Sequence, residues 1–390
     1  MILNKDRTRA LVVSHFLIDP LVNAASSTSI RNFLLKKVKQ VTQIEQPFAE
    51  SKETKVSILV YEDGRIKKSI KTTTVKKPTF LVYVINPIIL VSLKLRHFSR
   101  YDVCIACDNL SFISMLPFRK LGIIKRLIYY SVDYVEERFQ NKILNTIYHV
   151  ADRLACKHSD VNWVVVKEQI NGRKKNGVVI ETCSPFEIVP IGFRNSEIDI
   201  LPLSKIDSNL LIFVGGLRPS AGPQIAISSL NYLQKKFPKI KLAIIGGGSY
   251  QEHLKILAKE LGVEKRVKFY GFVKSHKKLV KIITRGAVGL APYTQTKNSI
   301  SYKSDPGKIK LYLACGLPVV TTKIATSGKV LEKKGAGIIA EFDEKGLSES
   351  VIYLLSNNKT YKKYRNDAEK LSAFYDVDRL MSVAFKNIPS

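Results

Sequence analysis

Short apolar runs alternate with segments of helical periodicity along the chain, and this alternation restricts the fold more than any other feature of the sequence. The runs are RALVVSHF (9–16), YDVCIACD (101–108), RLIYYSVD (126–133), LLIFVGGL (210–217) and KLAIIGGG (241–248). Because neighbouring parallel strands need a crossover between them, the pattern predicts an α/β architecture with parallel sheets. The segment 55–73 is an exception, since its Asp63-Gly64 pair predicts the turn of a β-hairpin.

The length of the chain and one polar segment indicate two domains. At 390 residues the chain exceeds the size at which a single hydrophobic core stops growing. The polar stretch 194–209 separates the two series of apolar runs and is the expected hinge. We therefore predict two Rossmann-like, doubly wound domains facing each other across a cleft, residues 1–203 and 204–373. Residues 374–390 would pack back on the first domain.

The strongest compositional bias is a net charge of +30, from 63 Lys and Arg against 33 Asp and Glu. The excess is shared by both halves of the chain. Such a charge favours anionic partners, which include a phosphorylated substrate, an anionic membrane surface and nucleic acid. No recognised nucleic-acid-binding module accompanies the charge, so we expect no nucleic-acid partner.

The sequence also predicts a cytoplasmic location. Met1 is followed by the polar stretch ILNKDRTR, so no secretory signal is expected, and five scattered cysteines favour a reducing compartment. The longest apolar run, Thr79–Leu95, has 17 residues, fewer than the roughly 20 that a spanning helix needs. We expect this run either to pack on a sheet or to lie on the inner face of the cell membrane, which would make the protein peripheral.

Two glycine-containing turns in the second half follow strands and lead into helices. VGGLRPSAG (214–222) contains Gly215 and Gly216, and IGGGSYQEHL (245–254) contains Gly247. Glycine lets the backbone approach a ligand, and a helix N-terminus presents N–H groups to phosphate. Each turn is a candidate phosphate site, with a plain tight turn as the alternative.

The segment SDPGKIKLYLACGLPVVTT (304–322) carries the strongest local signal. We expect Asp305 to cap a helix, Pro306 to take the first helical position and Gly307 to bare the backbone there. Lys308 would then stand in the first turn, where its charge opposes the helix dipole unless an anion is bound. The segment therefore predicts a bound phosphate.

Further candidates lie in loops that follow strands. Phe272 and Val273 come after a strand in the second half, at an edge where a flat base could stack. The long polar loop 291–305, which contains Tyr293 and Ser301, is well placed to contact a sugar. Loops of this length usually carry function or motion.

Polar residues after the strands of the first half form a candidate acceptor side. They are His15, Asp19, Asp108, Asn109 and Arg138. Asp133 also ends a strand, where it could act as a base or orient a hydroxyl group, with a helix cap as the alternative. The chain contains no HExxH motif, paired CxxC motif or nucleophile elbow, so we expect neither a metal site nor a cofactor.

At this point the second half resembles a known family. The matching pieces are FVGGLRPSAGPQIAI, KLAIIGGGSYQEHLKILAKELGVEKRVKFYGFV, AVGLAPY and SDPGKIKLYLACGLPVVTT. Their order and spacing over residues 210–345 are similar to the donor domains of GT-B glycosyltransferases, especially retaining, family-4-like (group 1) enzymes. The resemblance implies a nucleotide-diphosphate sugar in the cleft, with Gly215–Gly216 and Gly307–Lys308 at the diphosphate and Phe272–Val273 near the base. It also implies metal-independent transfer, in which N–H groups and cations stabilise the departing diphosphate.

Four positions depart from the family pattern. Gly216 and Ala221 stand where the family commonly has an arginine and a lysine, which leaves Arg218 as the nearest substitute. Lys303 and Leu311 stand where the family has two glutamates that contact the sugar and the ribose. A leucine offers no hydrogen bond to a ribose hydroxyl group.

We expect a glycosyltransferase that moves a sugar, with retention, from a nucleotide-diphosphate sugar to a lipid-linked or polysaccharide acceptor of the cell envelope. Arg218 and Lys308 would carry the charge of the leaving group. Asp133, in the neighbourhood of the family's missing histidine, would be a third catalytic residue. The main alternative is a non-catalytic GT-B binding subunit, which the lost glutamates favour, and an epimerase of the same fold is another.

Overall fold

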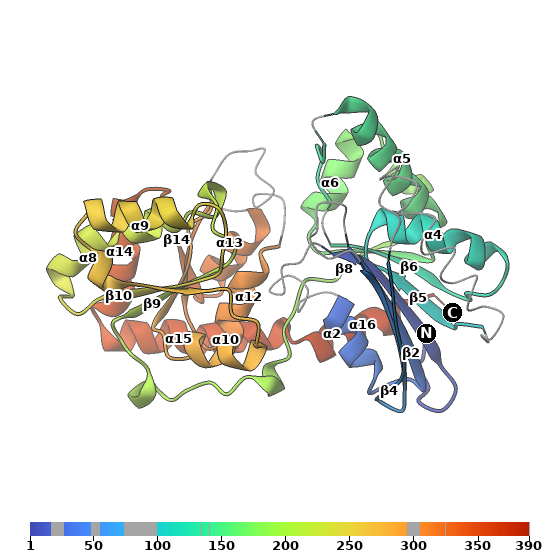
Figure 1. The fold of residues 1–390 in the computed structure, drawn as a ribbon, viewed down its shortest axis with the longest axis horizontal. Coiled ribbons are helices and arrows are strands. Elements are labelled where there is room, and N and C mark those ends of the chain that lie inside the picture. The colour runs from blue at the N-terminus through green and yellow to red at the C-terminus, as the bar shows by residue number, and fades with distance from the viewer. Residues whose placement is uncertain are drawn as a thin grey trace. The chain divides into compact units, whose positions relative to one another are not determined.

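The structure is a computed structural model, and it divides the chain into two compact units. It describes residues 1–16, 27–47, 55–73, 100–132, 134–139, 141–294, 305–323 and 325–389. The first unit comprises Met1–Ile191 and Val377–Ser390, and the second comprises Gly192–Asp376 (Figure 1). Residues 192–203 join the second unit through hydrogen bonds such as that from Arg365 Nη2 to the carbonyl oxygen of Leu201, at 2.6 Å.

Within the described residues, the first unit is built on an eight-stranded sheet with the strand order β4-β3-β2-β1-β5-β6-β7-β8. The strands are β1 (Arg9–Phe16), β2 (Gln40–Pro47), β3 (Lys55–Glu62), β4 (Arg65–Thr73), β5 (Val103–Ala106), β6 (Leu127–Ser131), β7 (Val161–Val164) and β8 (Phe186–Ile188). Neighbouring strands are parallel except in the β2–β3 and β3–β4 pairs. The predicted hairpin is confirmed, and its turn has positive φ angles of 50° at Asp63 and 77° at Gly64.

Helices cover both faces of this sheet. They are α2 (Ser27–Leu34), α4 (Asn109–Lys120), α5 (Lys142–His158), α6 (Glu168–Lys175) and α16 (Val377–Asn387). Ala10 and Val12 of β1 belong to a buried cluster that includes residues of α2 and α16, whereas Leu11 and Val13 belong to a cluster with residues of α4 and α5. Buried residues at every position of a strand are expected where a parallel sheet has both faces covered.

The second unit contains a six-stranded sheet in its described residues, with the strand order β11-β10-β9-β12-β13-β14 and parallel pairs throughout. The strands are β9 (Leu210–Val214), β10 (Lys241–Ile245), β11 (Val267–Gly271), β12 (Val288–Ala291), β13 (Val319–Thr322) and β14 (Gly337–Ala340). The helices are α7 (Pro223–Ser228), α8 (Leu230–Lys236), α9 (Gln251–Glu260), α10 (His276–Ile283), α12 (Gly307–Ala314), α13 (Ala325–Lys333), α14 (Glu344–Leu355) and α15 (Asn358–Phe374). The predicted α/β class, with two doubly wound parallel-sheet units, is confirmed.

Both sheets reverse their strand order beside their first strand. In the first unit the reversal lies between β1 and β5, and in the second unit it lies between β9 and β12. Loops leave the two strands of such a pair in opposite directions, so a crevice opens at their carboxyl ends, where open α/β sheets bind ligands. These two places are therefore where the chemistry of each unit is to be sought.

Candidate functional site

The switch point of the second sheet brings together three of the predicted donor-site residues. Gly215 follows β9, Tyr293 follows β12, and Lys308 stands in the first turn of α12. The side chain of Lys308 passes so close to Gly215 that a Cβ atom added there would lie 3.3 Å from both Cε and Nζ of the lysine. The glycine turn after β9 and the lysine of α12 thus form one local site.

The ammonium group of Lys308 is buried without a hydrogen-bond partner among the described residues. Its Nζ lies 4.2 Å from the ring centroid of Phe213 and 4.5 Å from that of Tyr293. Burial, and then the nearby charge of Arg218, lower the pKa of Lys308 to about 7. Two aromatic faces stabilise a cation only in part, so this group needs an anion to hold its full charge.

Arg218 adds a second positive charge to the site. Its backbone precedes the short 3₁₀ turn Pro219–Ala221, and its side chain is exposed. Within the part of the chain that the structure describes, neither Arg218 nor Lys308 forms an ion pair with a carboxylate. Two neighbouring cations beside a helix N-terminus form a ready site for a polyanion.

Backbone hydrogen bonds join the carboxyl ends of β9, β10 and β11 next to this site. The N–H of Gly215 donates to the carbonyl oxygen of Ile245 at 2.9 Å, and the N–H of Gly246 donates to that of Gly271 at the same distance. Gly246 has φ = 146°, and a Cβ atom there would lie 1.9 Å from the carbonyl oxygen of Gly215. Only glycine fits at position 246, because the two turns touch backbone to backbone.

Other predicted donor residues lie along the same carboxyl edge of the sheet. Gly216 continues the first turn, and the carbonyl oxygen of Gly247 accepts the N–H of Leu217 at 2.9 Å. Phe272 follows β11 and its side chain is 40% exposed, while Val273 beside it is half-buried. An exposed aromatic ring at this edge is available to stack on a base.

Tyr312 positions α12 and is a residue that the sequence did not point to. Its hydroxyl group accepts the N–H of Val214 at 2.7 Å and donates to the carbonyl oxygen of Leu290 at 3.1 Å. It therefore ties α12 to the ends of β9 and β12, the two strands of the switch point. Gly289 makes room for the ring, since a Cβ atom there would lie 2.4 Å from it.

The prediction that Asp305 caps α12 is wrong. The N-cap position is held by Pro306, without a side-chain cap hydrogen bond, and Gly307 is the first helical residue. The buried carboxylate of Asp305 instead forms an ion pair with Lys310 and accepts a hydrogen bond from Ser327 Oγ at 2.8 Å. Both partners contact Oδ1, and among the described residues no side chain caps the start of α12.

Leu311 is buried, with 3% of its surface exposed. It follows Lys308 by three residues and therefore lies on the same side of α12. At this place in the fold the chain presents an aliphatic side chain where the family resemblance implies a carboxylate.

The switch point of the first sheet brings two predicted acceptor-side residues into contact. His15 ends β1, Asp108 follows β5, and His15 Nδ1 lies 3.1 Å from Asp108 Oδ1. Asp108 is also the N-cap of α4 and accepts the N–H of Ser111 at 2.7 Å. Burial acts to raise the pKa of Asp108, but the charge of His15 and the hydrogen bonds from His15 and Ser111 lower it to about 2.

Two more acceptor-side candidates have structural contacts nearby. The side chain of Asn109 donates to the carbonyl oxygen of Tyr148 on α5 at 3.1 Å, and the backbone N–H of Arg138 donates to Asn145 Oδ1 at 2.9 Å. The predicted site residues Asp19, Asp133 and Ser301, as well as Lys303 and the apolar run Thr79–Leu95, lie outside the described residues.

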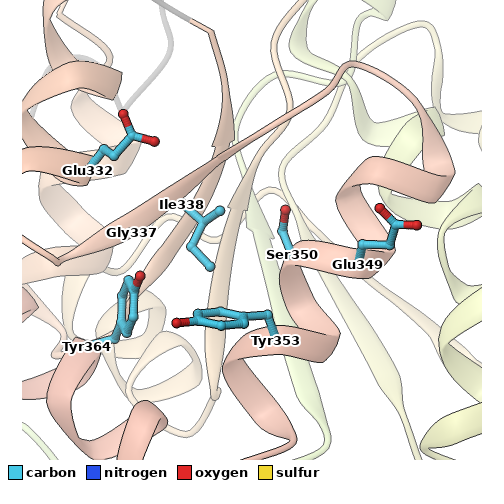
Figure 2. Close-up of a pocket in the computed structure, with 7 residues that line it drawn as sticks. All are labelled: Glu332, Gly337, Ile338, Glu349, Ser350, Tyr353 and Tyr364. Atoms are coloured by element: carbon cyan, nitrogen blue, oxygen red, sulfur yellow. The ribbon is translucent and has the colours of Figure 1, made fainter.

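A separate cavity of about 290 Å³ lies at the other edge of the second sheet, beside β14. Figure 2 shows its lining residues, Glu332, Gly337, Ile338, Glu349, Ser350, Tyr353 and Tyr364. The rings of Tyr353 and Tyr364 meet edge to face at 6.2 Å. This cavity shares no residue with the site around Lys308.

Two further findings concern the described residues alone. Among them, no group of three or more His, Cys, Asp and Glu side chains is arranged to hold a metal ion. Within the same part of the chain, every helix is too short or too polar to cross a membrane.

Comparison with known proteins gives matches in sequence and in fold. Residues 201–371 match the family described as "Glycosyl transferases group 1". An uncharacterized glycosyltransferase of Haemophilus influenzae is 24% identical over 200 residues, which cover 50% of this chain and 53% of that protein. The D-inositol 3-phosphate glycosyltransferase of Corynebacterium jeikeium is 30% identical over 119 residues, which cover 28% of this chain and 26% of that protein. The chain thus spans about half, or less, of the length of these relatives.

Solved structures match nearly the whole chain. Sucrose-phosphate synthase of Thermosynechococcus elongatus superposes with a TM-score of 0.69 at 12% identity, covering 97% of this chain and 98% of that one. HepE of Anabaena, solved in complex with UDP-glucose, gives 0.69 at 13% identity, covering 97% and 99%. The fold is GT-B. Within this fold, the match to the group 1 glycosyltransferase family covers residues 201–371.

Proposed function

We propose that this protein is a glycosyltransferase that uses a nucleotide-diphosphate sugar as donor. The observation that carries the proposal is the ammonium group of Lys308, which is buried at the switch point of the donor-side sheet and has no hydrogen-bond partner among the residues that the structure describes. A cation in this state costs free energy unless a ligand supplies the opposite charge. Selection for a stable fold alone would favour an uncharged side chain at this position.

A diphosphate fits the site by charge and by geometry. Lys308 and Arg218 supply two positive charges, and the start of α12 supplies N–H groups without intrahelical acceptors. The turn at Gly215 lacks a side chain that would keep a phosphate away from the backbone. These groups would bind the donor and then stabilise the negative charge that develops on the departing nucleoside diphosphate.

The cations of this chain take the place of those that the family commonly has in the turn after β9. Gly216 and Ala221 occupy those positions, whereas Arg218 stands between them in sequence and Lys308 reaches the turn from α12. The proposed mechanism is therefore metal-independent transfer with retention, in which Phe272 lies near the base. Asp133 and the His15–Asp108 pair remain the candidates for the acceptor side.

The nature of the acceptor is the least constrained part of the proposal. We favour a lipid-linked or polysaccharide acceptor of the cell envelope at the inner face of the cell membrane, because the net charge of +30 suits an anionic surface. HepE, a protein of the same fold, is described in complex with UDP-glucose, which makes UDP-sugars the first donors to test.

The test is donor binding and turnover by the full chain and by Lys308→Met, which keeps the length of the side chain without its charge. Calorimetry with UDP-glucose and UDP should show a Kd that is higher by about ten- to a hundredfold in the variant. Lys345→Met, at an exposed lysine of α14, is the matched control and should bind like the wild type. If the wild type binds no member of a panel of nucleotide sugars, or if Lys308→Met equals it in affinity and in donor hydrolysis, the proposal fails.

A second candidate function is supported by Leu311. A buried leucine on the Lys308 side of α12 offers nothing to a ribose hydroxyl group, which favours a GT-B subunit that binds a nucleotide without turning it over. Tight binding of UDP-sugars together with no release of UDP, in the presence of lipid and glycan acceptors, would select this function over the enzyme.

A further inference from the structure

Helix α5 of the first unit carries a stripe of aliphatic side chains on its outer face. Ile143, Val150 and Leu154 are 71%, 41% and 41% exposed, and Ile147 between them is half-buried. Their spacing of four, three and four residues places them on one side of the helix. Single exposed aliphatic residues are common, but a continuous stripe along about three turns needs a partner.

The stripe cannot turn inward, because the opposite face of α5 is fixed by a buried ion pair. Asp152 Oδ1 lies 2.8 Å from Arg173 Nη2 and accepts the hydroxyl group of Tyr129 at 2.6 Å. Rotating α5 to bury the stripe would separate these buried charges, which is strongly destabilising. The outward position of the stripe is therefore built into the fold.

The exposed charges that α5 itself carries beside the stripe are all positive. Lys142, Arg153 and Lys157 are exposed on the adjoining side of α5, and the only acidic residue of this helix is the buried, paired Asp152. The neighbouring helix α6 ends in the exposed Lys174 and Lys175. An aliphatic stripe with a cationic border is complementary to a surface that is apolar inside and anionic outside.

We propose that α5 is a docking surface for an anionic phospholipid bilayer. The helix lies along the membrane plane, with Ile143, Val150 and Leu154 inserted at the boundary between head groups and acyl chains. Lys142, Arg153 and Lys157 contact the lipid phosphates. The inference goes beyond sugar transfer, since the surface uses none of the residues assigned to the donor or the acceptor.

A bilayer fits this surface better than a protein does. The exposed aliphatic side chains of one helix of 17 residues cannot supply the roughly 800 Å² per partner that a stable protein interface buries. Interface cores are also depleted in lysine, whereas α5 borders its stripe with lysines. A membrane requires only shallow insertion along the length of one helix.

The test is cosedimentation of the full chain with phosphatidylcholine vesicles that contain or lack phosphatidylglycerol. The wild type should bind the anionic vesicles, and Ile143→Ser combined with Leu154→Ser should lower the partition coefficient at least about tenfold. Ile256→Ser is the matched control, because Ile256 on α9 is 56% exposed and lies in the second unit. The double variant Lys142→Gln, Lys157→Gln should bind anionic vesicles more weakly, and its binding should depend less on salt. The control double variant on α15, Lys362→Gln, Lys363→Gln, should show smaller changes in both.

Three results would overturn the proposal. The wild type could fail to bind anionic vesicles, or the Ile143→Ser, Leu154→Ser variant could bind them as well as Ile256→Ser does. The wild type could also form dimers in solution that the stripe variant loses, which would make a second copy of the chain the occupant. Thermal unfolding and UDP-glucose binding, measured without vesicles, should be the same in the stripe variant as in the wild type, so that a folding defect or a failure of the donor site is told apart from a loss of docking.

Discussion

The two switch points occupy the same place in their sheets but hold their charges in opposite ways. In the first unit, Asp108 is paired with His15 and accepts a hydrogen bond from the N–H of Ser111, so its charge is satisfied within the protein. In the second unit, Lys308 faces two aromatic rings and the charge of Arg218. The topology provides a crevice in both cases, whereas the balance of charge distinguishes a site that is complete from one that requires a ligand.

The largest expected effect comes from disturbing the contact between the glycine turns after β9 and β10, at the second switch point. Gly246→Ala should destabilise the protein by about 3 kcal/mol or more, because the new Cβ atom would meet the carbonyl oxygen of Gly215 at a positive φ. Gly247→Ala is the matched control, since nothing lies within 4 Å of a Cβ atom there. Urea unfolding of both variants measures the difference. Equal stabilities of the two variants would mean that the backbone at Gly246 does not pack closely against the carbonyl oxygen of Gly215.

The next prediction uses the pKa of Lys308. This pKa is about 7 in the folded chain against 10.5 for an ordinary lysine, so the unfolded chain binds more protons between these values. The contribution of Lys308 to the free energy of unfolding should therefore rise with pH across this window, by up to about 1.4 kcal/mol per unit. The difference between the wild type and Lys308→Met, measured from about pH 6 to about pH 9, isolates this contribution.

Donor affinity should change in the opposite direction. Below pH 7 the ammonium group is already charged, whereas above it the binding of a diphosphate must take up a proton. The Kd for UDP should therefore rise with pH in the wild type, by up to about tenfold per unit, and stay flatter in Lys308→Met. Calorimetry in buffers of different ionisation enthalpy counts the protons. No proton uptake at about pH 8 would contradict a buried, partnerless lysine.

The first switch point should respond to acid. The pKa of Asp108 is about 2 against an ordinary 3.8, so its stabilising contribution is present above 3.8 and is lost as the pH falls through about 2. Asp108→Asn should cost about 2 kcal/mol near neutral pH and should flatten the loss of stability in acid. Asparagine also caps helices well, so the start of α4 should survive the change. If Asp108→Asn unfolds in acid as the wild type does, the His15 pair does not hold that charge.

Sequence periodicity was sufficient for the architecture because it reports burial directly. Apolar runs buried on both faces predicted parallel sheets, and Asp63-Gly64 predicted the β3–β4 hairpin. The conflict between the charge of Lys308 and the helix dipole led to the prediction of a phosphate site there without any knowledge of its neighbours. These signals are local, so one segment of sequence contains them.

The contacts that complete each site could not be predicted from the sequence, because they join segments that are far apart in the chain. His15 and Asp108 are 93 residues apart, and no pattern in either segment predicts that the two side chains pair. Asp305 was assigned to a helix cap because the local rule applies to it, but Ser327, 22 residues later, and Lys310 compete for its carboxylate. The role of Tyr312 could not be predicted for the same reason, since its hydrogen-bond partners lie at the ends of two strands, β9 and β12.

Tyr312→Phe has the smallest expected effect. It tests whether the hydrogen bonds of the Tyr312 hydroxyl group, which tie α12 to β9 and β12, position Lys308. The ring still fills the space beside Gly289, but the N–H of Val214 and the carbonyl oxygen of Leu290 lose their partner. The expected cost is about 1–2 kcal/mol of stability, together with a weaker affinity for UDP because α12 is no longer tied to β9 and β12.

The matched control for this change is Tyr361→Phe. The hydroxyl group of Tyr361 donates to the carbonyl oxygen of Ala287 at 2.9 Å, at the other end of β12 from the site. This control should lose stability without losing affinity for UDP. If both variants lose stability alone, Tyr312 serves the core of the second unit and Lys308 is positioned by the aromatic rings around it. If only Tyr312→Phe weakens binding, the hydroxyl group that joins the two strands at the switch point also sets the position of the ammonium group of Lys308.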